Sequence, residues 1–412
     1  MQRVVVTGIG LITPLGNDTA TTWDGLIAGR SGIGPITLFD TSAYECPIAG
    51  EVRGLDPADF VDAKLLRRLD RSSVFALAGA QQAIADASLD MTRENAKRVG
   101  VVLGTGMGGA QLIIEQSDVL EEKGPRRVSP FMTSHMLPDT ATGLIAIAIG
   151  ARGPNFGISA ACATGGASAG EAAEIIASGR ADVMITGGFE APLTPTYYAG
   201  FNAMKALAVA EDPTKAVRPF DANRSGFILG EGAAIMVLES LEHAQARGAR
   251  IYAEWLGAAT TNDAYDMVAA AEDGHGVAEA MRDAMERANI GPADIDYINA
   301  HGTGTALNDR VETVAIHDVF GEEADRLMVS STKSMLGHMM GAAGAVEAAI
   351  TALVCYHGMV PPTINYETPD PDCDLDYVPN VARTAEVRRA MSTSVGLGGH
   401  NSAIIFGKWE NA

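Results

Sequence analysis

The chain has 412 residues, 47% of them hydrophobic, which is enough to bury a large core in two or three domain-sized units. Aspartate and glutamate number 51 against 30 lysines and arginines, so the net charge of −21 makes nucleic acid and membrane surfaces poor partners. The four cysteines form no C-x-x-C pair, which argues against a disulfide framework or a structural zinc site and favours a reducing cytoplasm.

The N-terminal residues M-Q-R-V-V-V-T-G-I-G predict a strand that runs into a glycine turn, not an export signal. No apolar run is expected to reach the length of a membrane span. Farther along, Lys64, Arg67 and Arg68 fall at the spacing i, i+3 and i+4, which places them on one face of a helix-like stretch. From spacing alone, a solvated helix face and a docking face are equally good interpretations.

The segment G-T-G-M-G-G at 104–109 follows an apolar strand-like run and matches the dinucleotide fingerprint G-x-G-x-x-G in form. The match stands alone, because no second strand ends in Asp or Glu at the expected distance. We interpret these glycines as the lining of an acyl or pantetheine channel.

The segment from 153 to 179 predicts a strand, a sharp turn at Cys162 and a helix that ends at Gly179. A thiol at a helix N-terminus faces unpaired N–H groups and the positive end of the helix dipole, which favour thiolate and can hold an oxyanion. Because most free cysteines are small buried hydrophobes, residue type alone would favour a structural role for Cys162.

Two histidines follow apolar runs in the C-terminal part. His301 opens H-G-T-G-T after a predicted strand, and His338 closes K-S-M-L-G-H before an alanine-rich helix. A histidine near the positive end of a helix tends to stay neutral and can donate a hydrogen bond to an enolate. The other six histidines show no zinc-binding spacing, so no metal is expected, and His243 and His317 are predicted to be solvated helix residues.

Apolar runs alternate with alanine-rich helical segments, which is typical of a layered α/β protein. I-S-A-A-C-A at 158–163 leads to E-A-A in the same way that V-S-S-T-K-S at 329–334 leads to a second E-A-A. G-A-A-I-M-V at 232–237 is echoed by N-S-A-I-I-F at 401–406 with a similar offset. These echoes predict an internal duplication into residues 1–250 with Cys162 and residues 251–412 with His301, Lys333 and His338.

Three ordered motifs, A-A-C-A-T-G, N-A-H-G-T-G-T and S-S-T-K-S-M-L-G-H, resemble those of the β-ketoacyl-acyl-carrier-protein synthases, most closely the elongating synthase II type. The resemblance also takes in D-A-N-R-S-G-F-I-L-G-E-G and G-G-H-N and covers essentially the whole chain. It implies a thiolase-like α/β fold with duplicated halves in five αβαβα layers, and a homodimer. It implies no cofactor, since the substrates travel on the phosphopantetheine of acyl carrier protein.

The resemblance also implies residue roles. Cys162 would take the acyl chain, His301 and His338 would assist decarboxylation of the malonyl group, and Lys333 would organise their electrostatics. The backbone N–H groups of Cys162 and Leu397 would form the oxyanion hole. By the same resemblance, Thr303 and Thr305 would touch the pantetheine arm, and the acidic residues Asp309, Glu312 and Glu347 would lie behind the site. The acyl pocket would be lined by Met107, Phe201 and Leu397. The acidic carrier would dock on six basic residues, Lys64, Arg67, Arg68, Arg126, Arg127 and Lys205.

One motif departs from the family. Val395 and Leu397 stand in S-V-G-L-G-G-H-N, where phenylalanines are usual, so the acyl gate and chain-length preference are expected to differ. Two other family activities stay open: a type II polyketide ketosynthase with the same three residues, and a non-catalytic partner subunit, which intact Cys162, His301 and His338 disfavour. A thiolase acting on coenzyme A is disfavoured because G-G-H-N stands where thiolases place a second cysteine.

Overall fold

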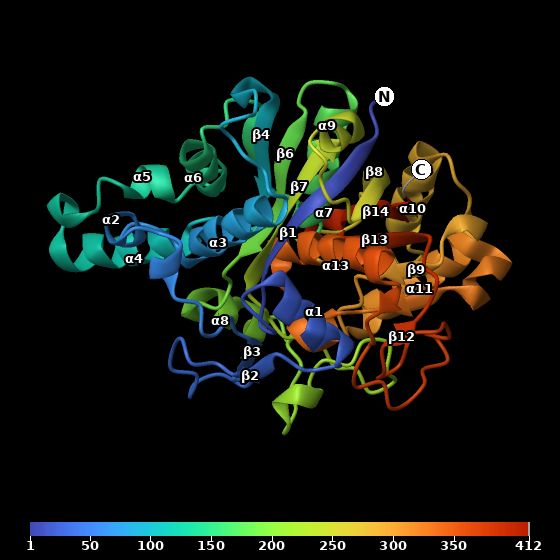
Figure 1. Cartoon of the computed structure of the whole chain (residues 1–412). Helices are drawn as coiled ribbons and strands as arrows, with labels where there is room; N and C mark the ends of the chain where they lie inside the picture. The colour runs from blue at the N-terminus through green and yellow to red at the C-terminus, as the bar shows by residue number, and fades with distance from the viewer. Residues whose placement is uncertain (411–412) are drawn as a thin grey trace.

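The computed structural model describes residues 1–410 and contains a ten-stranded mixed sheet in the order β10-β9-β13-β14-β8-β1-β7-β6-β4-β5 (Figure 1). The strands run over β1 (Val4–Ile12), β4 (Val99–Gly104), β5 (Asn155–Ile158), β6 (Val183–Glu190), β7 (Gly232–Ser240), β8 (Ala253–Asn262), β9 (Tyr297–Asn299), β10 (Met328–Ser330), β13 (Arg389–Gly396) and β14 (His400–Lys408).

The two halves of the sheet have the same topology. The order β5-β4-β6-β7-β1 in the N-terminal half is repeated as β10-β9-β13-β14-β8 in the C-terminal half, with the same parallel and antiparallel pairs. Both sequence echoes fall on equivalent elements, at β5 with β10 and at β7 with β14. The predicted duplication of the fold is therefore confirmed, and the two half-sheets join where β1 pairs with β8 over residues 4–6 and 253–255.

Six helices complete the layers. Two pack on the outer face of the N-terminal half-sheet, two lie between the half-sheets and contact strands of both, and two share a hydrophobic cluster with the outer face of the C-terminal half-sheet. In that order they are α3 (Arg71–Asp86) and α6 (Thr140–Ile149), α7 (Thr164–Ala177) and α13 (Ala343–His357), and α10 (His275–Ala288) and α11 (Ala306–Phe320). This arrangement is the thiolase-like five-layered fold that the resemblance implies.

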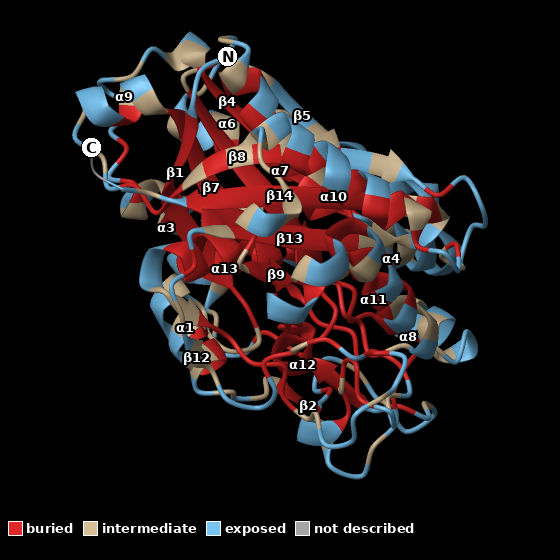
Figure 2. Ribbon diagram, turned by 90° about the vertical axis from the view of Figure 1, so that its right-hand side faces the viewer, coloured by how far each residue is buried: buried red, intermediate tan, exposed pale blue. Residues whose placement is uncertain are grey.

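Most residues of the two central helices are buried, although α7 exposes Glu174 on one side, and Figure 2 shows α13 as buried ribbon. They approach closely because small residues meet: a Cβ atom on Gly165 would lie 2.2 Å from the backbone nitrogen of Ala345. Contrary to expectation, the 18-residue stretch Met340–His357 is long and apolar enough to cross a membrane. It is 83% buried inside the protein, as the core helix of a folded domain would be.

Shorter helices and strands surround this core. The helices α2, α4 and α5 project together to one side of the N-terminal half (Figure 1). The remaining elements are helices α1 (Thr19–Ile27), α2 (Ala63–Leu66), α4 (Ala110–Lys123), α5 (Met132–His135), α8 (Pro195–Ala203), α9 (Leu241–Ala246) and α12 (Lys333–Leu336), and the short strands β2 (Ile33–Pro35), β3 (Ile48–Gly50), β11 (Met359–Val360) and β12 (Arg383–Thr384). The predicted basic helix is shorter than expected, since Arg67 caps α2 and Arg68 lies beyond it.

Candidate active site

Cys162 lies in a sharp turn between β5 and α7, and only 5% of it is exposed. The turn requires Ala161 to adopt φ 48°, an unusual value for a residue with a side chain. The backbone N–H of Ala160 donates to Thr164 Oγ1 at 2.7 Å, which fixes the turn against the first residue of α7. The predicted strand, turn and helix are therefore confirmed around this thiol.

Burial raises the pKa of the Cys162 thiol to about 11, although the Lys333 cation and the N–H of Leu397 act in the opposite direction. The carboxyl groups of Glu190 and Glu347 add to the upward shift of this pKa. The expected bias toward thiolate is therefore wrong for the resting protein. Loss of water around the sulfur outweighs the helix N-terminus, so a base must take the proton when the sulfur reacts.

His338 is the group placed to do so, because its Nε2 atom lies 3.1 Å from Cys162 Sγ. The His301 ring lies next to it, with ring centroids 5.2 Å apart and planes at 83°. Phe227 packs its ring edge-on against His338 at a centroid distance of 5.4 Å. One thiol and two imidazoles from both halves of the chain thus meet at one point.

Both imidazoles are only 2% exposed, and their pKa values lie well below 6.5. Burial is the main cause, and the Lys333 cation adds to the downward shift in each case. The expectation that His338 stays neutral is confirmed. The principal causes differ from the expected one, being burial and Lys333 instead of a helix end.

Lys333 is buried and uses its three N–H bonds on three acceptors. Nζ donates to the His301 carbonyl at 2.6 Å, contacts His301 Nδ1 at 3.2 Å, and forms a short ion pair with Glu347. Burial raises the pKa of Glu347 to about 7 against the opposing effect of Lys333. Because an ammonium group only donates, His301 Nδ1 must accept, and the ring proton is on Nε2.

Two buried carboxylates hold the loop after His301. Glu312 accepts from the backbone N–H groups of His301 and Gly302, both at 2.8 Å, and from Thr393 Oγ1 at 2.7 Å. Asp309 accepts from Gly304 N at 3.1 Å, and burial raises its pKa to about 6. Both residues lie behind the histidine loop, where the resemblance puts them, and they fix its backbone.

Leu397 follows β13 and is 36% exposed. Its backbone N–H faces the Cys162 sulfur and acts to lower the thiol pKa. The following Gly398 has φ 79°, a value that glycine adopts freely, and it donates to the Met267 carbonyl at 2.9 Å. The glycine backbone and this hydrogen bond form the turn without any contact that requires an aromatic side chain at position 397.

A cavity of about 190 Å³ opens at the sulfur and is almost entirely apolar. Phe201 and Leu397 line it, as do Thr303 and Thr305, whose hydroxyl oxygens are 2.9 Å apart. The other lining residues are Cys162, Met204, Ala206, Phe227, Val268, Ala270, His301, Leu307, Asn308, His338, Met340, Val395 and Gly396. Since Met204 and Val268 are exposed, the cavity reaches the surface.

Met107 is not among the residues that line this cavity, nor is any other residue of 104–109. The backbone N–H groups of Gly106 and Met107 instead donate to Glu190, at 2.7 and 3.2 Å. Glu190 also accepts from Gly341 N at 3.0 Å, and burial raises its pKa to about 7. Sequence reasoning did not single out Glu190, although its place at the end of an apolar strand could have indicated it.

The six predicted docking cations lie on the outside. Arg68 stacks over the Phe131 ring at 3.6 Å, which links α2 to the start of α5. Arg126 and Arg127 are exposed on the adjoining turn, while Lys205 follows Met204 at the cavity mouth. Within residues 1–410 none of the six forms an ion pair, even though the chain is strongly acidic.

His243 and His317 differ in their surroundings. His243 is not solvated: it is half-buried and its ring nitrogens contact Glu239 and Glu94 at 2.6 and 2.8 Å. His317 is partly exposed on α11 and contacts Asp374. No cluster of three or more His, Cys, Asp or Glu side chains in residues 1–410 is arranged to hold a metal ion.

Family models for the two domains of β-ketoacyl synthases match the chain, the N-terminal domain over residues 1–244 and the C-terminal domain over residues 252–367. The chain belongs to the β-ketoacyl synthase family. A Staphylococcus aureus protein named 3-oxoacyl-[acyl-carrier-protein] synthase 2 is 49% identical over 99% of both chains, and a Synechocystis protein of the same name is 48% identical over 99% of both.

Solved structures of β-ketoacyl synthases agree with this assignment. The ishigamide ketosynthase/chain length factor superposes with a TM-score of 0.93 at 37% identity, covering 99% of this chain and 100% of the other. A β-ketoacyl synthase from Burkholderia phymatum gives a TM-score of 0.91 at 34% identity over 100% of both chains. The predicted family and fold are therefore confirmed.

Proposed function

We propose that this β-ketoacyl synthase condenses an acyl thioester on acyl carrier protein with malonyl-acyl carrier protein, and so elongates fatty acids by a decarboxylative Claisen reaction. The contact of 3.1 Å between Cys162 Sγ and His338 Nε2, at the bottom of an apolar cavity, carries the proposal. The relatives named 3-oxoacyl-[acyl-carrier-protein] synthase 2 support it further.

The first half-reaction transfers the acyl group. His338 Nε2 takes the thiol proton, and the Cys162 sulfur attacks the thioester carbonyl while the N–H groups of Cys162 and Leu397 hold the oxyanion. The bond between the carbonyl carbon and the pantetheine sulfur then breaks. The departing sulfur takes the proton from His338, so the free carrier thiol leaves and Cys162 stays acylated.

The second half-reaction uses the neutral imidazoles. Malonyl thioester loses its carboxylate as carbon dioxide, and the electron pair forms an enolate whose oxygen accepts a hydrogen bond from the Nε2–H group of His301. The enolate carbon attacks the acyl carbonyl on Cys162, and the Cys162 sulfur leaves and takes up one proton, which solvent supplies through His338 Nε2. Lys333 keeps the His301 proton on Nε2 by donating to Nδ1.

Carrier binding follows from two other features. Thr303 and Thr305 line the cavity next to His301 and would contact the pantetheine arm. The unpaired cations Lys64, Arg67, Arg68, Arg126, Arg127 and Lys205 would attract the acidic carrier. An acyl-carrier protein is bound to its ketosynthase in the solved AntDE:AntF complex, whose chain is 36% identical with a TM-score of 0.91.

We also propose a homodimer, in the cytoplasm. Strand β5 is the last strand of the sheet and one of its edges is open, with Phe156 37% exposed on it. Ile147 of the neighbouring α6 is 80% exposed, so a second copy would cover an apolar edge. The four cysteines are free thiols, which suits a reducing compartment such as the cytoplasm. We also place the boundary between the two halves of the chain at residue 250.

A type II polyketide ketosynthase is the second candidate, because the solved AntDE:AntF complex contains a type II PKS acyl-carrier protein with its ketosynthase. The identity of 36% to that chain is lower than the 49% shared with synthase 2, which favours fatty acid elongation. Incubation with acyl carrier and malonyl carrier, followed by mass analysis, tests the choice. A single two-carbon extension of a saturated acyl chain is expected, and repeated extension to a polyketide would contradict it.

A further inference from the structure

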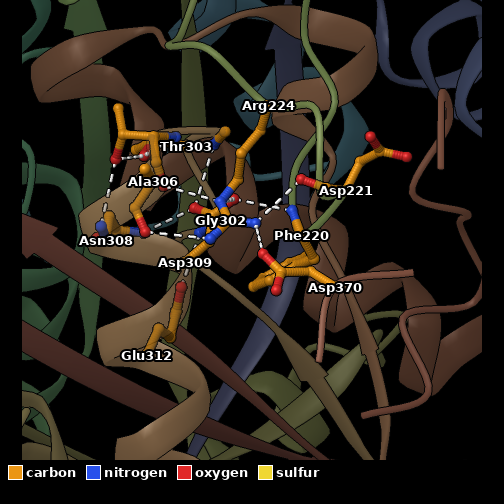
Figure 3. A network of polar contacts seen from close by, with 12 residues as sticks. Phe220, Asp221, Arg224, Gly302, Thr303, Ala306, Asn308, Asp309, Glu312 and Asp370 are labelled. Atoms are coloured by element: carbon orange, nitrogen blue, oxygen red, sulfur yellow. Dashed lines mark hydrogen bonds and ion pairs between the residues drawn. The ribbon is translucent and has the colours of Figure 1, made fainter. Parts of the chain in front are cut away.

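Arg224 joins three segments of the chain, as Figure 3 shows: its own turn, the loop of Thr305 and Ala306, and the segment that carries Asp370. Its side chain is only 6% exposed, although arginine is rarely buried. Nη1 donates to the Asp221 carbonyl at 3.0 Å in its own turn and forms a short ion pair with Asp370. Nε and Nη2 donate to the carbonyls of Thr305 and Ala306, at 3.3 and 3.1 Å.

These carbonyls stand directly behind the residues that line the cavity. Thr305 caps α11 by accepting from Asn308 N, and its hydroxyl lies 2.9 Å from that of Thr303. The N–H groups of the same loop are held by Glu312 and Asp309, while its carbonyls at 305 and 306 are held by Arg224. Arg224 thus completes the set of bonds that fixes the two threonine hydroxyls.

The charge of Arg224 is balanced from both sides. Asp309 Oδ2 lies 3.8 Å from Nε on the side of α11, and Asp370 lies on the other side. Asp221 accepts from the N–H groups of Glu367 and Thr368 at 2.7 and 2.6 Å, which ties the segment carrying Asp370 to the turn carrying Arg224. The segment P-D-P-D-C-D-L-D-Y-V-P at 369–379 thereby supports the loop that follows His301, through Asp370 and Arg224.

We propose that Arg224 is a positioning residue for the pantetheine arm, acting through the backbone of Thr305 and Ala306 on the hydroxyls of Thr303 and Thr305. The proposal rests on the proposed function, because it takes those hydroxyls as the partners of pantetheine. Arg224 does not contact Cys162 or either catalytic imidazole. Its loss should therefore weaken the binding of pantetheine thioesters and leave the reactivity of the thiol unchanged.

The test compares Arg224→Gln with Arg98→Gln, a matched control whose arginine also binds an aspartate and a carbonyl but lies far from the cavity. For Arg224→Gln we expect KM for malonyl-pantetheine and malonyl carrier to rise about tenfold, with kcat within about threefold of the parent. Alkylation of Cys162 by iodoacetamide should keep its rate, and Arg224→Lys should recover part of the KM. Arg98→Gln should change none of these values.

A double-mutant cycle with Thr305→Val sharpens the test. If Arg224 acts through Thr305, the two KM effects combine to less than their product. An unchanged KM with activity reduced only in proportion to the folded fraction would overturn the proposal, as would equal loss of thiol alkylation. If Arg224→Gln does not fold, Asp370→Asn serves, and an unchanged KM in that variant would be equally decisive. Absence of condensation by the parent protein would instead contradict the proposed function.

Discussion

Two histidine clusters in this protein contain the same kinds of side chain in different arrangements. In the active site, Lys333 lies between the His301 ring and the Glu347 carboxylate, so the imidazole contacts the cation. At the start of α9, His243 contacts the carboxylates of Glu239 and Glu94 directly. Burial and Lys333 hold the pKa of His301 well below 6.5, whereas the hydrogen bond to Glu239 raises the pKa of His243 to about 9.

The contrast shows that burial and the group in contact with the ring together decide the charge of an imidazole. The Glu347 carboxylate does not stabilise a protonated His301 ring, because the ammonium group of Lys333 lies between them. The active site can therefore hold a fixed positive charge on Lys333 and keep its histidines as neutral donors. The outer cluster has the opposite result, with a charged histidine that ties α9 to β7.

The largest expected effect tests whether the neutral imidazoles act independently of the thiol. Cys162→Ala should lower condensation by more than about 10³-fold, because no nucleophile remains. Release of carbon dioxide from malonyl carrier should continue slowly, since His301 and His338 are intact. Mass analysis and carbon dioxide assays measure the two activities. Loss of both in a folded variant would show that the imidazoles do not act alone.

Replacing Lys333 should remove the feature that distinguishes the active-site histidines from the outer cluster. Lys333→Met leaves Glu347 buried without its partner, and we expect a loss of stability of about 3–5 kcal/mol in urea unfolding. Condensation should fall by about 10²-fold or more because the His301 proton is no longer fixed on Nε2. Lys333→Met with Glu347→Leu should regain most of the stability without the activity. Recovery of both would contradict a role for the lysine charge.

The pH dependence of Cys162 alkylation tests the dry environment of the site. Burial raises the pKa of this thiol to about 11, so the thiolate fraction grows with pH throughout the neutral range. We expect the iodoacetamide rate at Cys162 to rise about tenfold per pH unit from pH 7 to pH 10. Peptide mapping assigns the label. A plateau beginning near pH 7 would mean that the histidine pair already holds a thiolate.

The smallest effect concerns the outer cluster. The raised pKa of His243 gives stability that is fully present below pH 6.5 and is lost as pH rises through about 9. The lowered pKa of Glu239, about 2, gives stability that is fully present above pH 4.5 and is lost as pH falls from 4.5 through about 2. Melting temperatures should therefore be highest between about pH 4.5 and 6.5.

His243→Gln should lower stability by about 1–2 kcal/mol below pH 6.5 and flatten the decline between pH 6.5 and 9. The matched control is His275→Gln, because His275 is an exposed histidine that also contacts an aspartate. That variant should keep most of the parent slope. Equal flattening in both variants would show that the slope comes from another group.

The sequence was informative wherever a local pattern determines the structure. The turn at Cys162, the loop of His301 and the repeat of strand and helix at β10 and α13 all follow from short segments. Contacts between distant residues could not be predicted in the same way. Glu94 lies 149 positions from His243 in sequence, so the charged state of that histidine depends on a contact that no local pattern reveals.

The thiolate expectation for Cys162 failed for the same reason. A helix N-terminus is visible in the sequence, but the loss of water around the sulfur results from packing by both halves of the chain. Likewise, the pairing of β1 with β8 joins strands about 250 residues apart, which only the folded chain determines. The alanine-rich helix after His338 was expected, but not the apolar length of Met340–His357, because Glu347 and several small residues interrupt its apolar pattern.

The close contact of Gly165 with Ala345 has a consequence for how the protein folds. Cys162 and His338 come from different halves, and they meet only when α7 and α13 have docked. Neither half contains both the thiol and the imidazoles, so condensation activity reports on docking. In denaturant, activity should disappear in the same transition as the docked core, and refolding should regain activity only in its last phase.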